Sequence, residues 1–159
     1  MDSVKTHVVL ALALALAGCE KYALDRQMEE LCKVDGGIVV YETVRLPPSR
    51  FNADGTLVPV VPHREGMPLA EHLLGKDYAI EQTFKTIKAG RPFGKMFSEG
   101  RLERYQAVVR RISDQKVLAV EVSYSRVGGE ITFNHPSQSS CPDPRPTPGL
   151  LTSTFTKGV

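Results

Sequence analysis

The apolar positions of this chain are most concentrated near its beginning. Val8–Ala17 is an uninterrupted run of ten apolar residues, and the short polar stretch before it carries Lys5. Such a run is half of the roughly 20 residues that a helix needs to cross the hydrocarbon core of a membrane. The pattern is therefore typical of the hydrophobic region of a signal peptide rather than of a membrane-spanning helix.

A helical spacing of apolar residues follows a few positions later. Leu24, Met28 and Leu31 fall at i, i+4 and i+7, which places them on one face of a helix. Asp25 would lie in the first turn, where the helix dipole favours an acid, and the glycine pair at 36–37 would end the helix. We expect a helix of about ten residues that is stabilised by docking its apolar face.

Four later segments have the composition and alternation of β-strands. They are residues 38–46, 77–88, 101–112 and 117–127. Residues 113–116 separate the last two strands and predict a hairpin. One apolar and one polar face indicate an antiparallel sheet that is covered on a single side, and the helix is the expected cover.

The inward faces of these strands are predicted with unequal clarity. The strand at 117–127 alternates best, with an apolar row formed by Leu118, Val120, Val122 and Tyr124. The apolar row of 77–88 is Tyr78, Ile80 and Phe84. The strand at 101–112 has no alternation that assigns its inward face.

Two segments contain too many prolines for regular strand pairing. Residues 47–76 hold prolines at 59, 62 and 68, and their pattern allows one helical turn at 69–74. Residues 128–149 are expected to form a loop, in which alternating prolines from position 142 to 148 favour extended backbone. Residues 150–156 could return as a short edge strand. The overall prediction is an α+β fold in a single domain, with an N-terminal helix packed on a four- to five-stranded antiparallel sheet and one disulfide.

The end of the apolar run carries a motif with a specific chemistry. Leu16-Ala17-Gly18-Cys19 resembles the lipobox of bacterial lipoprotein precursors, in which the cysteine thiol receives a diacylglyceryl group. The resemblance predicts a signal peptide at 1–18, cleavage between Gly18 and Cys19, and a mature domain at 19–159. An ordinary secretory signal is the alternative. The lipid on Cys19 would attach the chain to a membrane, and Glu20 favours the outer membrane because it is not the aspartate associated with inner-membrane retention.

Lipidation of Cys19 leaves two of the three cysteines, Cys32 and Cys141. An even pair in an oxidising compartment favours a structural disulfide, which would stabilise the fold by roughly 4–5 kcal/mol. Two free thiols or an intermolecular bridge are the alternatives.

No arrangement of residues predicts a cofactor or a phosphate, calcium or nucleic-acid site. The net charge is +2, without the electrostatic footprint of a nucleic-acid-binding protein. Gly90–Met96 is one residue shorter than a phosphate loop and lacks the hydroxyl that would bind magnesium. Asn52–Gly55 resembles the centre of a calcium loop, but Arg50 and Val61 stand where the first and last ligands belong.

No catalytic or metal-binding set is predicted either. The histidines beyond the signal segment are His63, His72 and His135, and their spacings are not those of zinc ligands. We interpret them as scattered surface residues. The chain has no Gly-x-Ser-x-Gly elbow and no Ser-x-x-Lys acylation motif.

Charged residues on the predicted strands give one further candidate. Glu42 falls in the same alternating row as Val40 and Val44, so partial burial is expected, and a buried carboxylate needs a partner. The candidate partners in a cross-strand ion pair are Arg101, Arg104, Arg110 and Arg126. A functional role for Glu42 is the alternative. Together with Arg111 these arginines make two strands basic, which we interpret as a solvated sheet face, with a surface for acidic partners or lipid headgroups as the alternative.

Two runs near the start of the mature chain carry a family resemblance. Leu31-Cys32-Lys33-Val34-Asp35-Gly36-Gly37 and Val40-Tyr41-Glu42 resemble the opening of small lipoproteins of proteobacteria and their prophages, and Ser140-Cys141-Pro142 resembles the closing part. The resemblance implies an envelope location and a fold, and it agrees with the pairing of Cys32 and Cys141. It implies no reaction.

These observations favour a membrane-anchored envelope lipoprotein that acts as a non-enzymatic binding or accessory module. An envelope protein or a cell-wall component is the expected partner. The alternative is a periplasmic inhibitor or immunity protein directed against a lysozyme-like or toxin enzyme, with the irregular segments 47–76 and 128–149 as the blocking loops. An enzyme is the third hypothesis.

Overall fold

The structure is a computed structural model that describes residues 20–93, 98–132, 135–143 and 149–158. A helix, an antiparallel sheet of five strands and the Cys32–Cys141 disulfide confirm the predicted α+β class in a single domain. The predicted signal peptide and Cys19 lie outside the described residues.

The chain divides into two compact units within this domain. Unit 1 comprises Met1–Gly36, Phe84–Tyr105 and Ser123–Pro142, and unit 2 comprises Gly37–Thr83, Gln106–Val122 and Asp143–Val159.

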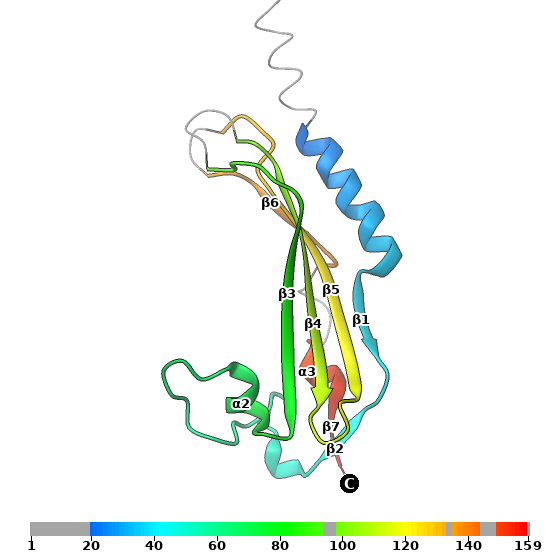
Figure 1. Cartoon of the computed structure of the whole chain (residues 1–159), viewed down its shortest axis with the longest axis vertical. Helices are drawn as coiled ribbons and strands as arrows, with labels where there is room; N and C mark the ends of the chain where they lie inside the picture. Colours follow the sequence, from blue (N-terminus) through cyan, green and yellow to red (C-terminus); the bar gives the residue numbers. More distant parts are fainter. Residues whose placement is uncertain (1–19, 94–97, 133–134, 144–148, 159) are drawn as a thin grey trace, which may run out of the picture. The chain divides into compact units, whose positions relative to one another are not determined.

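Three strands of eleven residues form most of the sheet (Figure 1). They are β3 (Tyr78–Lys88), β4 (Arg101–Arg111) and β5 (Val117–Val127), and the sheet order is β1-β5-β4-β3. β5 pairs antiparallel with β1 (Gly37–Val40) along residues 119–122 and with β6 (Gln138–Cys141) along residues 124–127. The strands expected at 77–88, 101–112 and 117–127 are therefore confirmed to within one residue at each end.

The strand β6 lies in a segment that the sequence predicts to be a loop. Its four residues, Gln-Ser-Ser-Cys, carry no apolar alternation. Pairing with β5 and the disulfide at Cys141 define this strand, and both are contacts with residues distant in the sequence. The prolines at 144, 146 and 148 lie outside the described residues.

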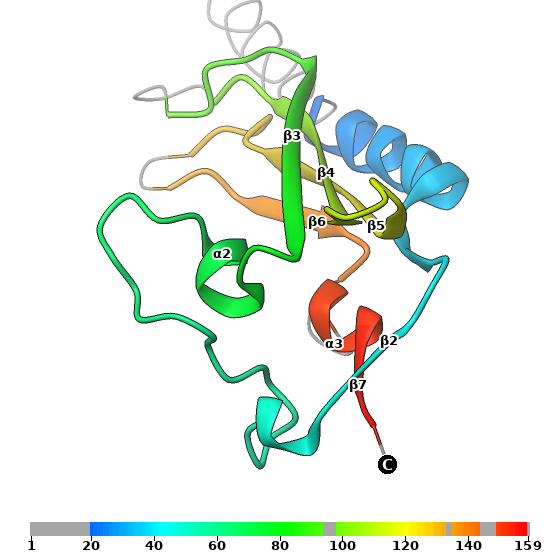
Figure 2. The ribbon, with the colours of Figure 1, turned by 60° about the horizontal axis from the view of Figure 1, so that its bottom comes forward.

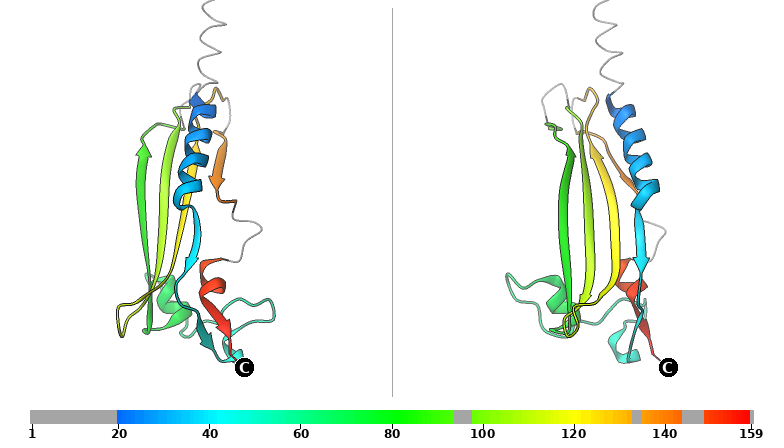
Figure 3. Two further views of the ribbon diagram at one scale, coloured as in Figure 1. Left: turned by 90° about the vertical axis from the view of Figure 1, so that its right-hand side faces the viewer. Right: turned by 45° about the vertical axis from the view of Figure 1, so that its right-hand side comes forward.

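Unit 1 contains a helix at 20–35 that lies beside its strands (Figure 3). Its buried side chains are one turn apart and are Leu24, Met28 and Cys32. The helix ends at the predicted glycine pair, where the Gly36 amide donates to the Cys32 carbonyl at 2.8 Å and Gly37 has φ 117°. A Cβ at Gly36 would lie 2.6 Å from the Cys32 carbonyl oxygen, so a side chain does not fit there.

The helix is longer than the predicted length of about ten residues. Contacts with distant segments hold its first turn: Glu20 forms an ion pair with Lys88, and the Lys21 amide donates to the Gly129 carbonyl at 2.9 Å. Such tertiary contacts leave no local pattern in the sequence, so the extra turn could not be predicted.

Unit 2 combines parts of the long strands with short elements (Figure 2). Besides β1, these elements are β2 (Val44–Leu46), η1 (Pro48–Arg50), α2 (Leu69–Leu74), α3 (Leu150–Thr154) and β7 (Phe155–Lys157). β2 and β7 pair in parallel, with Val44 opposite Phe155. The Phe155 side chain is 1% exposed, and its ring centre lies 5.0 Å from that of Tyr78. The helical turn predicted at 69–74 is confirmed.

The prediction of one continuous strand at 38–46 is wrong, because this segment forms two strands, β1 and β2. The amides of Tyr41 and Glu42 both donate to the Leu118 carbonyl, at 2.8 and 3.1 Å, and β1 ends there. The chain then leaves β5, and β2 pairs with β7. The alternation of side chains continues through the break, so the sequence gives no signal of it. The edge strand expected at 150–156 is also wrong in most of its length, because residues 150–154 form α3 and only the part from Phe155 is a strand.

The buried faces of the strands explain why the sequence predicted the inward-facing residues of some strands and not of others. The buried row of β5 contains Leu118, Val122 and Tyr124, as predicted, and extends to Arg126; Val120 is partly exposed. In β4 the buried residues change from Leu102 to Ala107 and Val109, so no single alternation describes the strand. Phe84 of β3 is 71% exposed and packs only partly, against Tyr105 at a ring-centre distance of 5.0 Å.

Candidate functional site

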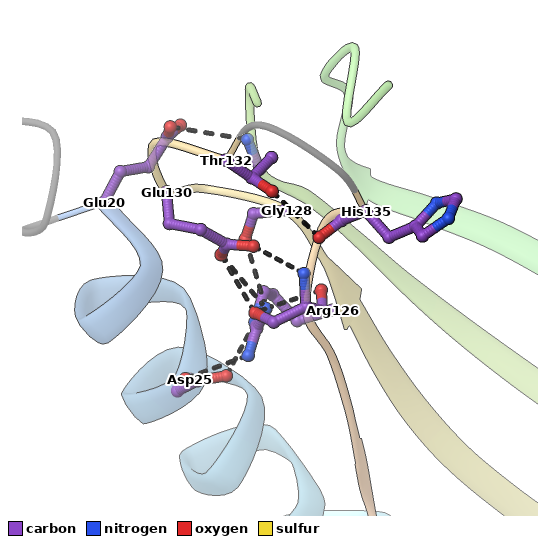
Figure 4. Close-up of polar contacts among 9 residues, drawn as sticks. Glu20, Asp25, Arg126, Gly128, Glu130, Thr132 and His135 are labelled. Carbon is purple, nitrogen blue, oxygen red and sulfur yellow. Dashed lines mark hydrogen bonds and ion pairs between the residues drawn. The ribbon is translucent and has the colours of Figure 1, made fainter. Parts of the chain in front are cut away.

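The most buried charged group described in unit 1 is the guanidinium of Arg126, at the end of the apolar row of β5. Its side chain is 2% exposed and forms a two-pronged ion pair with Asp25 of helix 20–35 (Figure 4). The Nε and Nη2 atoms of Arg126 donate to the two Asp25 carboxylate oxygens at 2.7 and 3.2 Å. This planar match is the strongest geometry available to an arginine and a carboxylate.

The remaining donors of Arg126 face the segment that follows β5. Its Nη1 donates to the Gly128 carbonyl at 3.2 Å and to the Ser137 carbonyl and hydroxyl at 2.9 and 2.7 Å, and Glu130 Oε2 lies 3.7 Å away. Glu130 in turn accepts hydrogen bonds from the Ser137 amide and hydroxyl at 2.5 and 2.9 Å. We call Asp25, Arg126, Glu130 and Ser137 the Arg126 cluster.

The glycine pair after β5 allows this cluster to form. Gly128 and Gly129 have φ of 78° and 95°, a region that residues with a Cβ rarely adopt. A Cβ on Gly129 would also lie 3.1 Å from Lys21 Cα, so the helix approaches this turn closely. Further along the chain, the Thr132 hydroxyl donates to the His135 carbonyl at 3.0 Å. The His135 ring points away from the cluster (Figure 4).

The Arg126 cluster is suited to stability rather than to chemistry. Each nitrogen of the Arg126 side chain already has a carboxylate, carbonyl or hydroxyl partner, so none is directed at a ligand. The predictions that Arg126 would pair with Glu42 or lie on a solvated face are wrong. A signal was present in the sequence, because Arg126 continues the alternating row of Val122 and Tyr124, and a buried arginine requires an acid.

The arginines of β4 also have acidic neighbours. The pairs are Arg101 with Glu103 at 3.5 Å, Arg104 with Asp35 at 2.9 Å, Arg110 with Glu81 at 3.0 Å, and Arg111 with Glu42 and with Asp114. Arg104 shares Asp35 with Tyr124, whose hydroxyl donates to it at 2.5 Å and is the largest cause that lowers the pKa of Asp35. The positive charge of the β4 arginines is therefore largely balanced by acidic side chains of the chain itself, which disfavours an open basic surface.

Glu42 lies between β1 and β2, and its side chain is 31% exposed. Its partners are Lys116, at 2.5 Å, and Arg111, so the four arginines predicted as partners are not the ones that bind it. Hydrogen bonds from Lys116 and then Arg111 lower the pKa of Glu42. A carboxylate held ionised in this way is a poor proton donor, which favours the structural interpretation.

Glu121 behaves differently from the other described carboxylates. Burial raises its pKa, whereas the pKa shifts resolved for the other carboxylates are all downward. It stands opposite Ile38 in the β1–β5 register, and the described residues give it no hydrogen bond or ion pair. The sequence placed Glu121 on the polar face of β5 and gave no reason to single it out.

Unit 2 has a surface groove beside α2 and the start of β3. Two adjoining hollows of about 350 and 440 Å³ share Lys76, Tyr78 and Ile112. The larger hollow is lined mainly by apolar residues, including Ala70, Ala79 and Ile80. Ile112 is 41% exposed at its edge, and Lys76 has no polar partner among the described residues. The groove can receive an apolar side chain of a partner and place a carboxylate near Lys76.

Two of the three histidines considered are not scattered. The rings of His63 and His72 lie with their centres 5.4 Å apart at an angle of 77°, although nine residues separate them. No group of three or more histidine, cysteine or acidic side chains gathers as a metal site in the described part of the chain. Asn52–Gly55 forms a hydrogen-bonded turn, and part of Gly90–Met96 lies outside the described residues.

Comparisons with protein families, with curated proteins and with solved structures found no match. Within the described ranges, no helix is both long and apolar enough to span a membrane. The disulfide joins Cys32 at the end of helix 20–35 to Cys141 at the end of β6, with Cα atoms 6.0 Å apart. This pairing was predicted from the cysteine count.

Proposed function

We propose that the chain is a lipoprotein of the bacterial cell envelope, attached to a membrane by a lipid on Cys19, and that its folded part is a non-enzymatic binding module. The observation that carries the proposal is the Cys32–Cys141 disulfide. Structural disulfides persist in oxidising compartments outside the cytoplasm. The disulfide also accounts for two of the three cysteines and leaves Cys19, in its lipobox-like sequence, for lipidation.

Attachment is tested by Cys19→Ser in the bacterial host. The variant should accumulate as unprocessed precursor and lose the lipid-dependent membrane attachment of the mature form, which labelling with a fatty-acid analogue and fractionation would measure. The matched control replaces Cys32 and Cys141 with Ala, because it changes cysteines without touching the lipobox, and it should still be labelled. Labelling of the Cys19→Ser variant would contradict the proposal.

The surface that we propose for binding is the groove of unit 2. Its lining includes five residues near the end of the irregular segment 47–76, which are Pro68, Ala70, Glu71, Gly75 and Lys76. Loops presented by a regular scaffold are common binding surfaces. The ion pairs of Glu42 and the β4 arginines support binding over catalysis, because they occupy groups that a reaction would need. An envelope protein or a wall component with an apolar group beside an acid fits the groove.

Binding is tested by site-specific photo-crosslinking in intact cells. A crosslinker at Ile112 should capture one defined partner, and Lys76→Glu should reduce that capture at least tenfold. The control position is Val34, which is 83% exposed but lies on helix 20–35 outside the groove. Equal capture from Ile112 and Val34 would contradict this assignment of the groove and would leave the attachment test unaffected.

A further inference from the structure

The His63–His72 pair of unit 2 is built by a local set of hydrogen bonds. The His72 carbonyl, near the end of α2, accepts hydrogen bonds from the amides of Val60 and Val61 at 2.9 and 3.4 Å. The ring of His72 also contacts Val61, since His72 Nδ1 lies 2.7 Å from the Val61 carbonyl oxygen. His63 is two residues after Val61, so these backbone and ring contacts of His72 bring the His63 ring beside the His72 ring.

Arg50 reinforces the arrangement from η1. Its Nη2 donates both to the Val58 carbonyl, at 3.3 Å, and to the Leu73 carbonyl, at 2.8 Å. These carbonyls belong to the two segments that carry the histidines. A Cβ at Gly75 would lie 3.6 Å from Val60, an ordinary van der Waals distance, so the end of α2 and the segment at Val60 are neighbours. The segment around His63 is therefore held against α2 on several sides.

The hydrogen bond at His72 also fixes its chemistry. A carbonyl oxygen can only accept, so Nδ1 must carry the proton that it donates to Val61. In the neutral ring Nε2 is then left with a free lone pair. Histidines that bind metals are commonly oriented in this way, with one ring nitrogen donating to a carbonyl and the other facing the ion.

The distance between the two rings suits a shared ion. Zinc–nitrogen bonds of roughly 2 Å with tetrahedral angles place the centres of two imidazoles about 5 Å apart. The observed distance is 5.4 Å. Imidazole nitrogen favours Zn²⁺, Cu²⁺ or Ni²⁺ over Mg²⁺ and Ca²⁺, which prefer oxygen.

We propose that His63 and His72 form a two-histidine site for a divalent transition-metal ion such as Zn²⁺. Water or a ligand from a bound partner fills the other coordination positions. The site is independent of the function proposed above, because it involves neither Cys19 nor the groove residues Lys76 and Ile112. The two histidines are nine residues apart with prolines between them, so their spacing in the sequence does not reveal the site.

The test is titration calorimetry of the purified, tag-free full chain with ZnCl₂ and, separately, NiCl₂. We expect one equivalent to bind, and His63→Ala to weaken binding at least tenfold. His7→Ala and His135→Ala are the matched controls, because they remove the other two of the four histidines, and both should bind as the parent does. MgCl₂ should give no binding.

A second measurement separates ligation from folding. His63 is exposed, and among the described residues its side chain makes no hydrogen bond, so His63→Ala should keep the thermal midpoint of the metal-free protein. Metal should raise the midpoint of the parent but not of this variant. Absence of Zn²⁺ and Ni²⁺ binding, or binding that persists in His63→Ala, would overturn the proposal.

Discussion

The two units of this chain are stabilised in different ways. In unit 1 a few groups join segments that are far apart in sequence: the disulfide links residues 109 positions apart, and the Asp25–Arg126 ion pair links residues 101 positions apart. In unit 2 short elements pack around apolar side chains such as Phe155, and ion pairs such as Arg111–Glu42 lie near the surface.

This difference has a consequence for function. The described part of unit 1 begins at Glu20, the residue after Cys19 in the sequence, and a few long-range connections stabilise it. Unit 2 carries the irregular segment 47–76, the groove and the histidine pair. Less regular, accessible segments are common binding surfaces in proteins. Single substitutions should therefore reduce stability most in unit 1 and alter recognition most in unit 2.

The largest loss is expected when the disulfide is removed. Replacing Cys32 and Cys141 with Ala should lower the free energy of unfolding by roughly 4–5 kcal/mol, because the cross-link closes a loop of about 100 residues in the unfolded chain. Urea unfolding of the purified protein measures this value. A loss below about 1 kcal/mol would mean that the unfolded state or other contacts already restrict these ends.

The next largest loss is expected at the Arg126 cluster. Arg126→Met should lower the free energy of unfolding by roughly 3–5 kcal/mol, because Asp25 and Glu130 would lose their buried cation. The matched control is Arg111→Met in unit 2, which should cost much less, because Glu42 keeps Lys116 and the pair is more exposed. Similar losses from the two variants, measured by urea unfolding, would contradict the contrast between the units.

A double-mutant cycle sharpens the result at this cluster. Asp25→Asn and Arg126→Met should be strongly non-additive, because each removes the same ion pair. Additive losses would show that the two side chains act independently.

The smallest expected effect distinguishes the units by its sign. Burial raises the pKa of Glu121 in unit 2, so the folded state holds this proton more tightly than the unfolded state. Stability should therefore fall as the pH rises from the unfolded pKa, about 4.3, through the higher folded pKa. Glu121→Gln should remove this fall and be slightly more stable than the parent at pH 7. The gain should be small, because solvent screens a partly exposed carboxylate.

Glu20 in unit 1 provides the opposite case. The hydrogen bond from Lys88 is the largest cause that lowers its pKa, so its contribution is present above the unfolded pKa and is lost as the pH falls through the folded pKa. Glu20→Gln should be less stable than the parent at pH 7, and this difference should shrink in acid. Thermal midpoints between pH 3 and pH 8, at roughly unit steps, would measure both curves. The same sign for both variants would contradict the assigned environments.

The regular parts of the fold were predictable because local patterns define them. The alternation of Leu118, Val122 and Tyr124 specified β5, and the glycine pair at 36–37 specified the end of the helix. The strand β6 was not predictable, because its residues carry no apolar alternation and it is defined by pairing with β5 and by the disulfide at Cys141. The break between β1 and β2 was missed for a related reason, since the Leu118 carbonyl that receives both amides is distant in sequence.

The candidate sites also differ in whether a local pattern or a contact between distant segments defines them. The disulfide followed from counting cysteines, which requires no geometry. The burial of Arg126, the partners of Glu42 and the contact between His63 and His72 each depend on which segments meet in space. Of these, only Arg126 left a trace in the sequence, as a charge at the end of an apolar row.

The disulfide also determines how the chain responds to mechanical tension. A pull applied between the two ends enters helix 20–35 and crosses at Cys32 directly to Cys141, so the residues between these cysteines are bypassed. About 370 Å of extended chain, at roughly 3.4 Å for each of the 109 residues, then cannot be drawn out while the bond is intact. Only the segments before Cys32 and after Cys141 can lengthen under such a pull, and forced extension of the oxidised protein should be short.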